Sequence, residues 1–482
     1  MIYRTLTGGN NLMSRVLYQP TWESLNEHKL PKWFMDAKLG IFIHWGVYSV
    51  PAWAPTYGEK KEYYNETIGH HPYAELYGYG MMYKNTPVWK YHVDTYGADF
   101  QYEDFIPRFT ADQWNPHGWA SLFKNIGAKY VVLVTKHSDG YCMWPTKQSH
   151  LNSMDTGPHR DITGELTKAV TAEGMKMGLY YSLTFNWYYP NFPHILYRDL
   201  SHKQMKELID SYKPDLLWSD DYWKPHEKSY AATWQSKELI SYFYNQAANP
   251  DEVLVNDRWG QEENGMQLGD FSTPEYSAIK NIPSFYWEMT RGLGISFGYN
   301  QNDEYMTPQE LINMFVDVVS KNGNLLLNVG PKADGTLDAV QVDRLLALGA
   351  FMHVNSEAIY GTRAWVDSEG ETADGSAVRF TTKDDHVFAT VLGADSSAEV
   401  TIKGLFAQPG TTITLLGTNQ ELAWTQQASD LSIELPGQVP NPHAYSLKIT
   451  PEPFRAMQKP KISLENKYGE IFRRSGFLTA NV

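Results

Sequence analysis

Between about residue 28 and residue 365, short apolar stretches alternate with amphipathic helical stretches, and this alternation constrains the fold more than any other feature of the sequence. The apolar stretches are bounded by polar residues and lie at 41–43, 131–134, 177–180, 216–218 and 253–255. Runs this short are typical of buried strands. Strands that alternate with helices predict an α/β protein with a parallel sheet, and the number of units predicts a (β/α)8-like barrel of the TIM type.

The stretches between these strands have the periodicity of amphipathic helices. In one of them, apolar residues recur at i, i+3, i+4 and i+7 before a glycine stop, at Trp119, Leu122, Phe123 and Ile126. The same spacing recurs within 205–212 and within 311–318. The last helix begins at Thr307-Pro308-Gln309-Glu310, which has the spacing of a capping box and proline at the first helical position.

The pattern changes after about residue 366. Short stretches with period-two alternation follow one another at 377–392, 399–402, 411–416, 431–435 and 445–449. They predict an antiparallel β-sandwich. We therefore expect an N-terminal extension (1–27), a barrel domain with the candidate catalytic residues (28–365), a C-terminal β-sandwich (366–451) and a tail (452–482). Trp424 is the only tryptophan of the predicted sandwich, which favours a structural role for this domain over a sugar-binding one.

The balance of charges excludes several classes of partner. The chain has 41 Lys and Arg against 55 Asp and Glu, a net charge of −14. Because an acidic surface repels phosphate groups, neither nucleic acid nor an anionic membrane is an expected partner. No apolar run approaches the roughly 18 residues of a membrane-spanning helix. The single cysteine, Cys142, excludes an intrachain disulfide and a multi-cysteine metal site.

The N-terminal residues leave the cellular compartment open. Residues 1–11 lack the apolar stretch of a secretory signal, and Met13 is a candidate native start. A complete chain predicts a cytoplasmic protein, whereas a trimmed signal peptide predicts a periplasmic or secreted one. The oligomeric state is open as well, and a homo-oligomer is one alternative.

Polar residues of an unusual composition follow the predicted strands. Because the C-terminal ends of barrel strands meet at one mouth, we expect these side chains to form one site. They are His44, His137 with Asp139, Tyr180 and Tyr181, Asp220 and Asp221, and Asp257 with Arg258. Imidazoles, aromatic rings and acids are typical of a carbohydrate site, which the aromatic content of 14% also suits. No HxH or HExxH spacing joins His44, His137 and Asp139, so no metal is predicted.

Asp220 is the most informative of these residues. It ends the stretch Leu216-Leu217-Trp218-Ser219-Asp220, and Trp218 shares its side of an extended strand. A carboxylate held there could attack an anomeric carbon while the indole flanks the sugar. The pattern alone also fits an aspartate that only caps the following turn.

Seven sequence blocks resemble the α-L-fucosidases of glycoside hydrolase family 29. In chain order they are KLGIFIHWGVYSVP (38–51), YVVLVTKHSDGYCMW (130–144), PDLLWSD (214–220), NDRWG (256–260), TPEY (273–276), YWEMTRGLGISFGYN (286–300) and NLLLNVGPKADG (324–335). They cover most of residues 28–365 in the family order. The resemblance implies a distorted (β/α)8 barrel followed by a β-sandwich. It also implies a retaining exo-glycosidase without a cofactor, acting on α-L-fucosyl oligosaccharides or related α-L-glycosides.

The resemblance implies a role for each matching residue. Asp220 matches the nucleophile, Glu275 matches the general acid/base of the most similar members, and Glu288 is the alternative acid/base. Residues that match sugar-binding positions are His44, Glu75, His137, Tyr180, Trp218 and Arg258, with Phe297 beside the C6 methyl group of fucose. The implied mechanism is a double displacement by two carboxyl groups about 5–5.5 Å apart.

Two departures from the family bear on the substrate. Ser138 stands in the substrate-binding region where the family usually has a second histidine, and Leu76 follows Glu75 where a tryptophan is common. Changing a residue that binds a sugar hydroxyl can change the preferred substrate. One alternative is therefore the same mechanism acting on α-L-glucosides or α-L-galactosides. An alternative of another class is a non-catalytic carbohydrate-binding protein, which the presence of both carboxylates disfavours.

Overall fold

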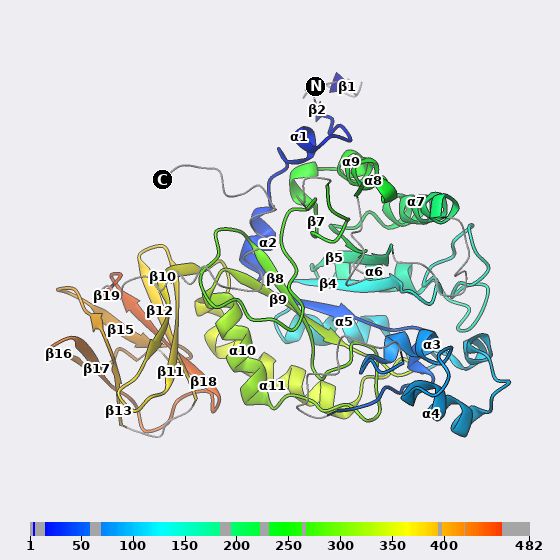
Figure 1. Cartoon of the computed structure of the whole chain (residues 1–482). Coiled ribbons are helices and arrows are strands. Elements are labelled where there is room, and N and C mark those ends of the chain that lie inside the picture. The colour runs from blue at the N-terminus through cyan, green and yellow to red at the C-terminus, as the bar shows by residue number, and fades with distance from the viewer. Residues whose placement is uncertain are drawn as a thin grey trace.

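The structure is a computed structural model that describes residues 3–4, 15–57, 69–183, 194–221, 231–262, 267–393, 398–418 and 420–455. Met13 and residues 456–482 of the predicted tail lie outside these residues. Figure 1 shows a larger part built from strands and helices, and a C-terminal part built from strands.

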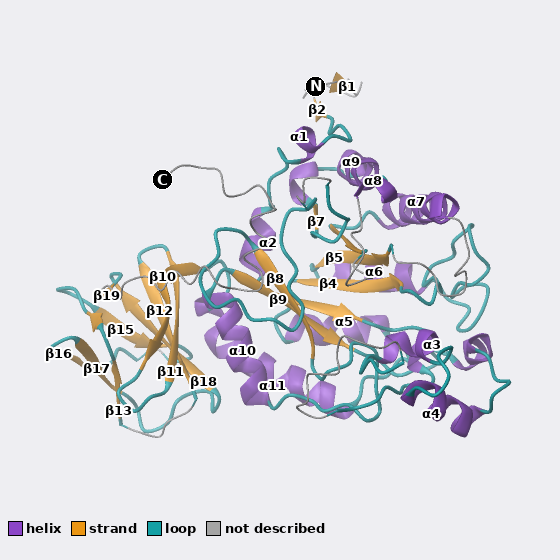
Figure 2. Cartoon of the chain, viewed as in Figure 1, coloured by secondary structure: helices purple, strands orange, loops and turns teal. Residues whose placement is uncertain are grey.

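Seven parallel strands form the sheet of the larger part (Figures 1 and 2). Their order in the sheet is β7-β6-β5-β4-β3-β9-β8. The strands are β3 (Leu39–Ile43), β4 (Tyr130–Lys136), β5 (Lys176–Ser182), β6 (Leu216–Asp220), β7 (Leu254–Val255), β8 (Trp287–Gly292) and β9 (Gly323–Val329). The five strands predicted from apolar runs correspond to β3 through β7 and are confirmed.

An irregular segment, residues 270–276, joins the two edges of this sheet. On one side, Asp270 N donates to Val255 O of β7 at 3.0 Å. On the other side, Glu275 forms a parallel bridge with Thr290 of β8. The segment thus takes the place of an eighth strand, and the TIM-like fold is confirmed in a distorted form. Among the described residues between β7 and β8 none is helical, so two of the barrel units lack a covering helix.

Helices connect most of the other strands (Figure 2). The helix predicted around 119–126 is α5 (Pro116–Asn125), and the capping box predicted at Thr307 starts α10 (Pro308–Ser320). The remaining helices are α1 (Trp22–Leu25), α2 (Lys32–Ala37), α3 (Tyr77–Gly80), α4 (Pro87–Tyr96), α6 (Ile162–Ala172), α7 (His194–Tyr212), α8 (Ala231–Trp234), α9 (Ser236–Gln246) and α11 (Ala339–Asn355). In the described part of the chain, none of them combines the length and apolar character needed to cross a membrane.

Alternation along the strands separates two apolar layers. Tyr180 of β5 belongs to a cluster with Phe42 and Trp218, which side chains of several neighbouring strands form inside the barrel. The next residue, Tyr181, belongs to the larger cluster between strands and helices. Period two therefore decides which side chains face the barrel interior, because successive residues point to opposite sides of a strand.

The C-terminal part is an antiparallel sandwich, as predicted. A five-stranded sheet has the order β10-β11-β12-β18-β15 and a three-stranded sheet the order β13-β17-β16. The strands are β10 (Arg363–Glu371), β11 (Ala377–Lys383), β12 (His386–Leu392), β13 (Glu399–Ile402), β15 (Thr412–Leu415), β16 (Trp424–Gln427), β17 (Asp430–Glu434) and β18 (Ala444–Thr450); short pairs form between β1 (Tyr3–Arg4) and β2 (Arg15–Val16), and between β14 (Leu405–Phe406) and β19 (Phe454–Arg455). Side chains of both larger sheets share one core, against which Trp424 packs.

Ion pairs tie the sandwich to α10 beside it (Figure 1). Asp317 of α10 accepts from Lys321 Nζ at 2.8 Å and from Arg379 Nε of β11 at 2.6 Å. Lys321 Nζ also lies 2.9 Å from Glu369 Oε1 of β10, and its side chain is 4% exposed. β10 covers the residues at which the sequence predicts the boundary between barrel and sandwich, and that boundary stays a prediction.

Candidate active site

The side chains predicted at strand ends converge at the C-terminal end of the barrel. His44 directly follows β3, His137 follows β4, and Asp220 is the last residue of β6. The rings at these strand ends lie close together. The ring centroid of His44 is 5.7 Å from that of His137 and 5.9 Å from that of Tyr180. Predicted site residues that the structure brings together are His44, Glu75, His137, Ser138, Tyr180, Trp218, Asp220, Arg258, Glu275 and Phe297.

Asp220 sits on an aromatic floor and accepts two hydrogen bonds. Its Oδ2 accepts from Tyr180 Oη at 3.0 Å and its Oδ1 from Arg258 Nη1 at 3.4 Å. The Trp218 ring stacks on Tyr180 at 5.4 Å, and the Arg258 guanidinium lies 4.9 Å above the indole. The Asp220 side chain is 22% exposed. A negatively charged carboxylate is therefore stabilised at a position that a ligand can reach.

Arg258 holds the two proposed catalytic carboxylates together. The same Nη1 atom that contacts Asp220 Oδ1 lies 3.2 Å from Glu275 Oε2. The two contacted carboxylate oxygens are therefore at most the sum of these distances apart, about 6.6 Å, which is compatible with the roughly 5–5.5 Å between the carboxyl groups of retaining glycosidases. Arg258 is itself fixed, because its Nε donates to Thr273 Oγ1 at 3.0 Å and its Nη2 to Thr273 O at 2.9 Å.

The environment of Glu275 favours its protonated form. Burial raises the pKa of Glu275, and the negative charge of Asp220 acts in the same direction. Arg258 and a hydrogen bond from Tyr73 oppose this effect, but the pKa stays above its usual value. The side chain is 33% exposed, so its proton is accessible to a bound molecule. A carboxylic acid with these properties suits general acid catalysis.

Glu288, the alternative acid/base, lies inside the barrel away from the mouth. It is the second residue of β8, near the N-terminal end of that strand, and it is 0% exposed. Its Oε1 accepts from Trp218 Nε1 at 3.1 Å, and its Oε2 accepts from the Tyr130 hydroxyl. Burial raises the pKa of Glu288 to about 7. Because the Trp218 ring forms part of the floor of the site, Glu288 cannot contact a leaving group from this position.

Asn328 of β9 orients two sugar-binding candidates. Its Nδ2 donates to Phe297 O at 2.6 Å, so its Oδ1 is the acceptor for His44 Nδ1 at 2.6 Å. Burial lowers the pKa of His44 to about 3, which keeps the ring neutral. The proton is therefore on Nδ1, and Nε2 is left to accept a hydrogen bond from a hydroxyl group. The Phe297 ring stacks on His44 at 4.9 Å.

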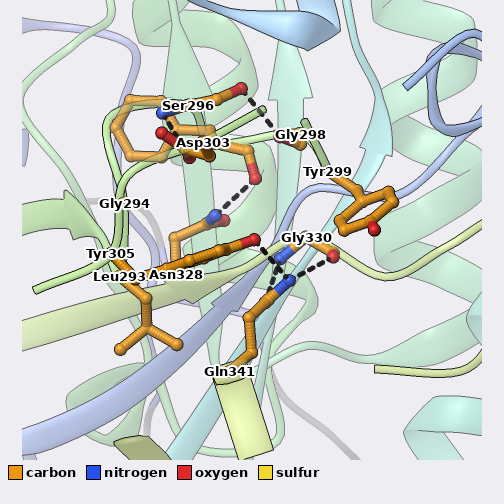
Figure 3. Close-up of a pocket in the computed structure, with 11 residues that line it drawn as sticks. Leu293, Gly294, Ser296, Gly298, Tyr299, Asp303, Tyr305, Asn328, Gly330 and Gln341 are labelled. Carbon is orange, nitrogen blue, oxygen red and sulfur yellow. Dashed lines mark hydrogen bonds between the residues drawn. The ribbon is translucent and has the colours of Figure 1, made fainter. Parts of the chain in front are cut away.

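A small pocket behind Phe297 shows how its loop is supported (Figure 3). Asp303 accepts from Ile295 N at 2.9 Å and from Ser296 N at 3.0 Å. Gln341 of α11 closes the other side, because its amide exchanges two hydrogen bonds with the backbone of Gly330 at 2.8 and 3.0 Å. The backbone that carries Phe297 is thereby fixed from both sides.

Glu75 and His137 occupy the other walls of the site. Glu75, in the short 3-10 helix η3 (Ala74–Leu76), is 3% exposed and accepts from Gly298 N at 2.7 Å. Burial raises the pKa of Glu75 to about 7. His137 stacks on Tyr180 at 5.9 Å, and its Nδ1 lies 3.1 Å from Ser138 Oγ. Ser138 is as buried as Glu75 and His44, and it lies beside His137 in the wall of the site.

Two residues of the predicted strand-end set point away from the site. Asp139 turns back into the loop, where it accepts from Tyr102 Oη at 2.9 Å and from Tyr141 N at 3.2 Å. Tyr181 faces the helices, where its Oη donates to Gln204 at 2.7 Å. In the residues that the structure describes, no group of three or more His, Cys, Asp or Glu side chains is arranged to hold a metal ion.

Sequence reasoning missed three residues that organise the site. Asn328 and Thr273 lie inside the quoted blocks NLLLNVG and TPEY, but nothing in their spacing indicates that they position His44 and Arg258. Tyr73, which hydrogen-bonds Glu275, lies in an irregular segment and carries no periodic signal. Their roles follow from contacts between segments far apart in the chain.

Comparison with known proteins identifies the family of the chain. A family model described as alpha-L-fucosidase matches residues 7–357, most of the chain. The chain belongs to the α-L-fucosidase family. It is therefore a retaining glycoside hydrolase. A second model, for the α-L-fucosidase C-terminal domain, matches residues 372–450, which places the sandwich in the same family context.

Individual α-L-fucosidases resemble the chain over nearly its whole length. The tissue alpha-L-fucosidase of Rattus norvegicus is 38% identical over 457 residues, which are 90% of this chain and 92% of the relative. The human tissue enzyme is 36% identical, with coverage of 90% and 92%. The crystal structure of Thermotoga maritima alpha-fucosidase is 41% identical with a TM-score of 0.79, and the match covers 90% of this chain and all of that one. The same Thermotoga enzyme has been solved in complex with fucose.

Proposed function

We propose that this protein is an exo-acting α-L-fucosidase in which Asp220 is the nucleophile and Glu275 the general acid/base. The observation that carries the proposal is the shared contact of one Arg258 nitrogen with both carboxylates, at 3.4 and 3.2 Å. This contact keeps an accessible carboxylate and an accessible acid close together, which supports a double displacement by these two groups. The relatives named above are α-L-fucosidases, which supports the sugar.

The first step of the proposed mechanism forms a glycosyl-enzyme. Asp220 Oδ attacks the anomeric carbon while Glu275 donates its proton to the leaving oxygen. Tyr180 Oη donates to Asp220 at 3.0 Å and fixes the direction of attack. Burial raises the pKa of Glu275 above its ordinary value, which is the direction that a general acid requires.

The second step releases the sugar. Glu275, now ionised, removes a proton from a water molecule, which attacks the anomeric carbon from the side that the leaving group has vacated. Arg258 stabilises the negative charge that passes from Asp220 to Glu275 and back during the two steps, because it contacts both. Two displacements at one carbon retain its configuration.

The walls of the site suit a neutral deoxy sugar. Glu75 and the Nε2 atom of His44 supply acceptors for hydroxyl groups, and Phe297 supplies an apolar face for a methyl group. His44 is neutral, so it neither attracts nor repels the positive charge that develops at the anomeric centre. We expect Tyr180 and Trp218 to form the floor beneath the reacting carbon.

The nucleophile is tested by a variant and its rescue. Asp220→Gly should lower kcat/KM for 4-nitrophenyl α-L-fucoside by more than about a thousandfold, and azide should restore turnover as a fucosyl azide of inverted configuration. Asp215→Asn, at the other end of the same strand and paired with Lys176, is the matched control and should retain activity. Loss of activity without azide rescue would count against Asp220 as the nucleophile.

The sugar is tested by comparing kcat/KM for the 4-nitrophenyl α-L-fucoside, α-L-galactoside and α-L-glucoside. We expect the fucoside to be preferred. A preference for either sugar with a 6-hydroxyl would leave the mechanism intact but overturn the assignment of fucose, and the vicinity of Ser138 and Leu76 would then be the place to alter. Binding of the sugar without any turnover would favour a carbohydrate-binding protein instead.

A further inference from the structure

Three aromatic rings extend from the sugar site past Glu275, and we name them the aromatic rim: His71, Tyr73 and Tyr276. Phe297, which stacks on His44, lies 5.8 Å from Tyr73 and 5.2 Å from Tyr276 between ring centroids. Tyr73 and Tyr276 are 6.4 Å apart with planes within 22° of each other, and His71 lies 6.4 Å from Tyr73 with planes within 4°. Tyr73 and Tyr276 therefore both adjoin Phe297, and His71 extends the aromatic lining beyond Tyr73.

Exposure increases along this row of rings. His44 is 4% exposed and Phe297 is 5% exposed, so both belong to the enclosed part of the site. The three residues of the aromatic rim are each partly exposed, as is Glu275 between them. The rim thus occupies the transition from the enclosed sugar pocket to solvent, on the side of the proposed acid.

Tyr276 is held in this position at a cost in backbone strain. Its φ of 49° is in the left-handed region, which non-glycine residues rarely adopt. Its Oη donates to Ile295 O at 2.6 Å and accepts from Gly292 N at 3.2 Å, so two hydrogen bonds hold the hydroxyl end of the side chain. Because Tyr276 directly follows Glu275, this conformation fixes the acid and the ring relative to each other.

Tyr73 connects the rim to the acid from the other side. Its hydroxyl hydrogen-bonds the Glu275 carboxylate, so its ring lies beside that group. In a retaining glycosidase the acid protonates the oxygen that links the sugar to its leaving group. Whatever this oxygen carries must therefore lie beside Glu275, in the space that the rim borders.

We propose that His71, Tyr73 and Tyr276 form the binding site for the leaving group, and that they take a pyranose or aryl group by stacking. The inference rests on the proposed function. Flat apolar faces match the C–H faces of a sugar ring and the face of an aryl ring, and they do not select for hydroxyl configuration. The rim therefore binds leaving groups by shape, whereas the enclosed pocket selects the sugar that is transferred.

The experiment compares substrates that differ only in the leaving group. The substrates are a fucosyl disaccharide, 4-nitrophenyl α-L-fucoside and α-L-fucosyl fluoride, which has no ring to stack. Tyr276→Ala and His71→Ala should each raise KM for the two ring-bearing substrates by roughly fivefold relative to the change seen with the fluoride. Tyr83→Ala, an exposed tyrosine beyond η3, is the matched control and should change none of the three.

Two outcomes would overturn the inference. Equal losses on the fluoride and on the ring-bearing substrates would mean that the rim is a wall of the sugar pocket itself. Unchanged kinetics on all three substrates in soluble His71→Ala and Tyr276→Ala proteins would mean that the rim binds nothing. A wild-type protein that hydrolyses none of the substrates would instead overturn the proposed function, which the fluoride reveals because it needs no leaving-group site.

Tyr73→Phe separates stacking from positioning, because it keeps the ring and removes the hydroxyl. KM for the disaccharide should stay within twofold of wild type. The basic limb of the kcat profile should move to higher pH, since a donor that stabilises ionised Glu275 is gone. If the Tyr73 hydroxyl had only a structural role, its removal would neither spare KM while changing the kcat profile nor move the basic limb to higher pH.

Discussion

At the scale of single residues, Arg258 couples the two carboxyl groups on which the proposed mechanism depends. Its Nη1 lies 3.4 Å from Asp220 and 3.2 Å from Glu275, and Thr273 holds its other nitrogens. A guanidinium in this position lowers the free energy of either ionised carboxylate, so it opposes the effect of burial on Glu275. Arg258 and burial thus act in opposite directions on the pKa of Glu275.

Replacing this cation should change the pH dependence of the enzyme. In Arg258→Met, the group that lowers the pKa of Glu275 is lost while burial remains, so Glu275 should keep its proton to higher pH. The basic limb of the kcat profile should move to higher pH, and kcat/KM should fall by about a hundredfold. Lys403→Met, on the sandwich, is the control for loss of one positive charge. A basic limb that moves to lower pH would contradict this assignment.

Glu288 offers a test of which glutamate is the acid. Glu275→Gln should lower kcat for substrates with poor leaving groups by more than about a hundredfold, because the proton is no longer available. Glu288→Gln keeps an acceptor under the Trp218 indole and should stay within about tenfold of wild type. Steady-state kinetics on a fucosyl disaccharide measure both. The reverse ranking would transfer the role of acid to Glu288.

Glu288 should also make stability depend on pH. Burial raises its pKa from 4.5 to about 7 in the folded protein, so the folded state binds the proton more tightly. Its contribution, about 3 kcal/mol, is fully present below pH 4.5 and is lost as pH rises through about 7. Thermal unfolding at pH 5 and pH 8 should therefore show that Glu288→Gln, which does not titrate, loses less stability between these values than wild type. Parallel losses would contradict the raised pKa.

At the scale of elements, helix ends with clear caps are the features that the sequence predicts best. The Thr307–Glu310 capping box is present as predicted, with Thr307 N donating to Glu310 at 2.8 Å. Thr307→Ala should destabilise the protein by about 1 kcal/mol and lower the midpoint of thermal unfolding. Thr171→Ala, at an exposed position inside α6, is the matched control and should have a smaller effect. Equal shifts in the two variants would mean that the cap contributes nothing beyond an exposed threonine.

Strands β3 through β7 could also be predicted from a local sequence pattern, whereas the irregular segment 270–276 could not. β3 through β7 are short apolar runs bounded by polar residues, so a local pattern identifies them. Residues 270–276 read DFSTPEY, with one large apolar residue and a proline, and the segment is held by hydrogen bonds to β7 and β8 that no local pattern records. The strand-end rule nevertheless found His44, His137, Asp220 and Arg258.

Ranking the site residues needed the three-dimensional structure. The resemblance to the family favours Glu275 over Glu288, and the structure adds that Glu288 lies deep in the barrel whereas Glu275 is partly exposed. Asp139 and Tyr181 follow predicted strands just as their neighbours do, but a loop turn and the alternation of β5 point them elsewhere. The direction of a side chain depends on the register of its strand. An error of one residue in the predicted register therefore turns every side chain to the opposite face.

At the scale of the whole molecule, a charge network joins the barrel to the sandwich. Asp317 accepts from Lys321 and Arg379 at 2.8 and 2.6 Å, and Lys321 is 4% exposed. Asp317→Asn would remove the negative charge that Lys321 and Arg379 share. We therefore expect the free energy of unfolding to fall by about 2–4 kcal/mol. Kinetics at 25 °C should be unchanged, because the network lies outside the site.

Thermal unfolding followed alongside activity measures this effect. Glu371→Gln is the control, since its pair with Lys403 is exposed on both sides and contributes little. Equal midpoints for Asp317→Asn and wild type would mean that the network adds nothing to the association of the two domains. A fall in kcat/KM without a fall in the midpoint would mean that the interface acts on the site instead.

The irregular segment 270–276, a seam in the barrel wall between β7 and β8, has a consequence for how such a protein can diversify. Asp220 ends a strand that pairs with β5 along its whole length, so its position cannot drift without disturbing this ladder. Glu275 and Tyr276 stand on the seam, residues 270–276, which hydrogen-bonds to β8 through Ser272, Pro274 and Tyr276 but lies outside the regular strands. Exchanges in the seam leave the ladder between β5 and β6 intact. Replacing residues 270–276 by the corresponding segment of a relative should therefore change the geometry of the acid or the preferred leaving group. Asp220 would remain the nucleophile, so the reaction would stay the same.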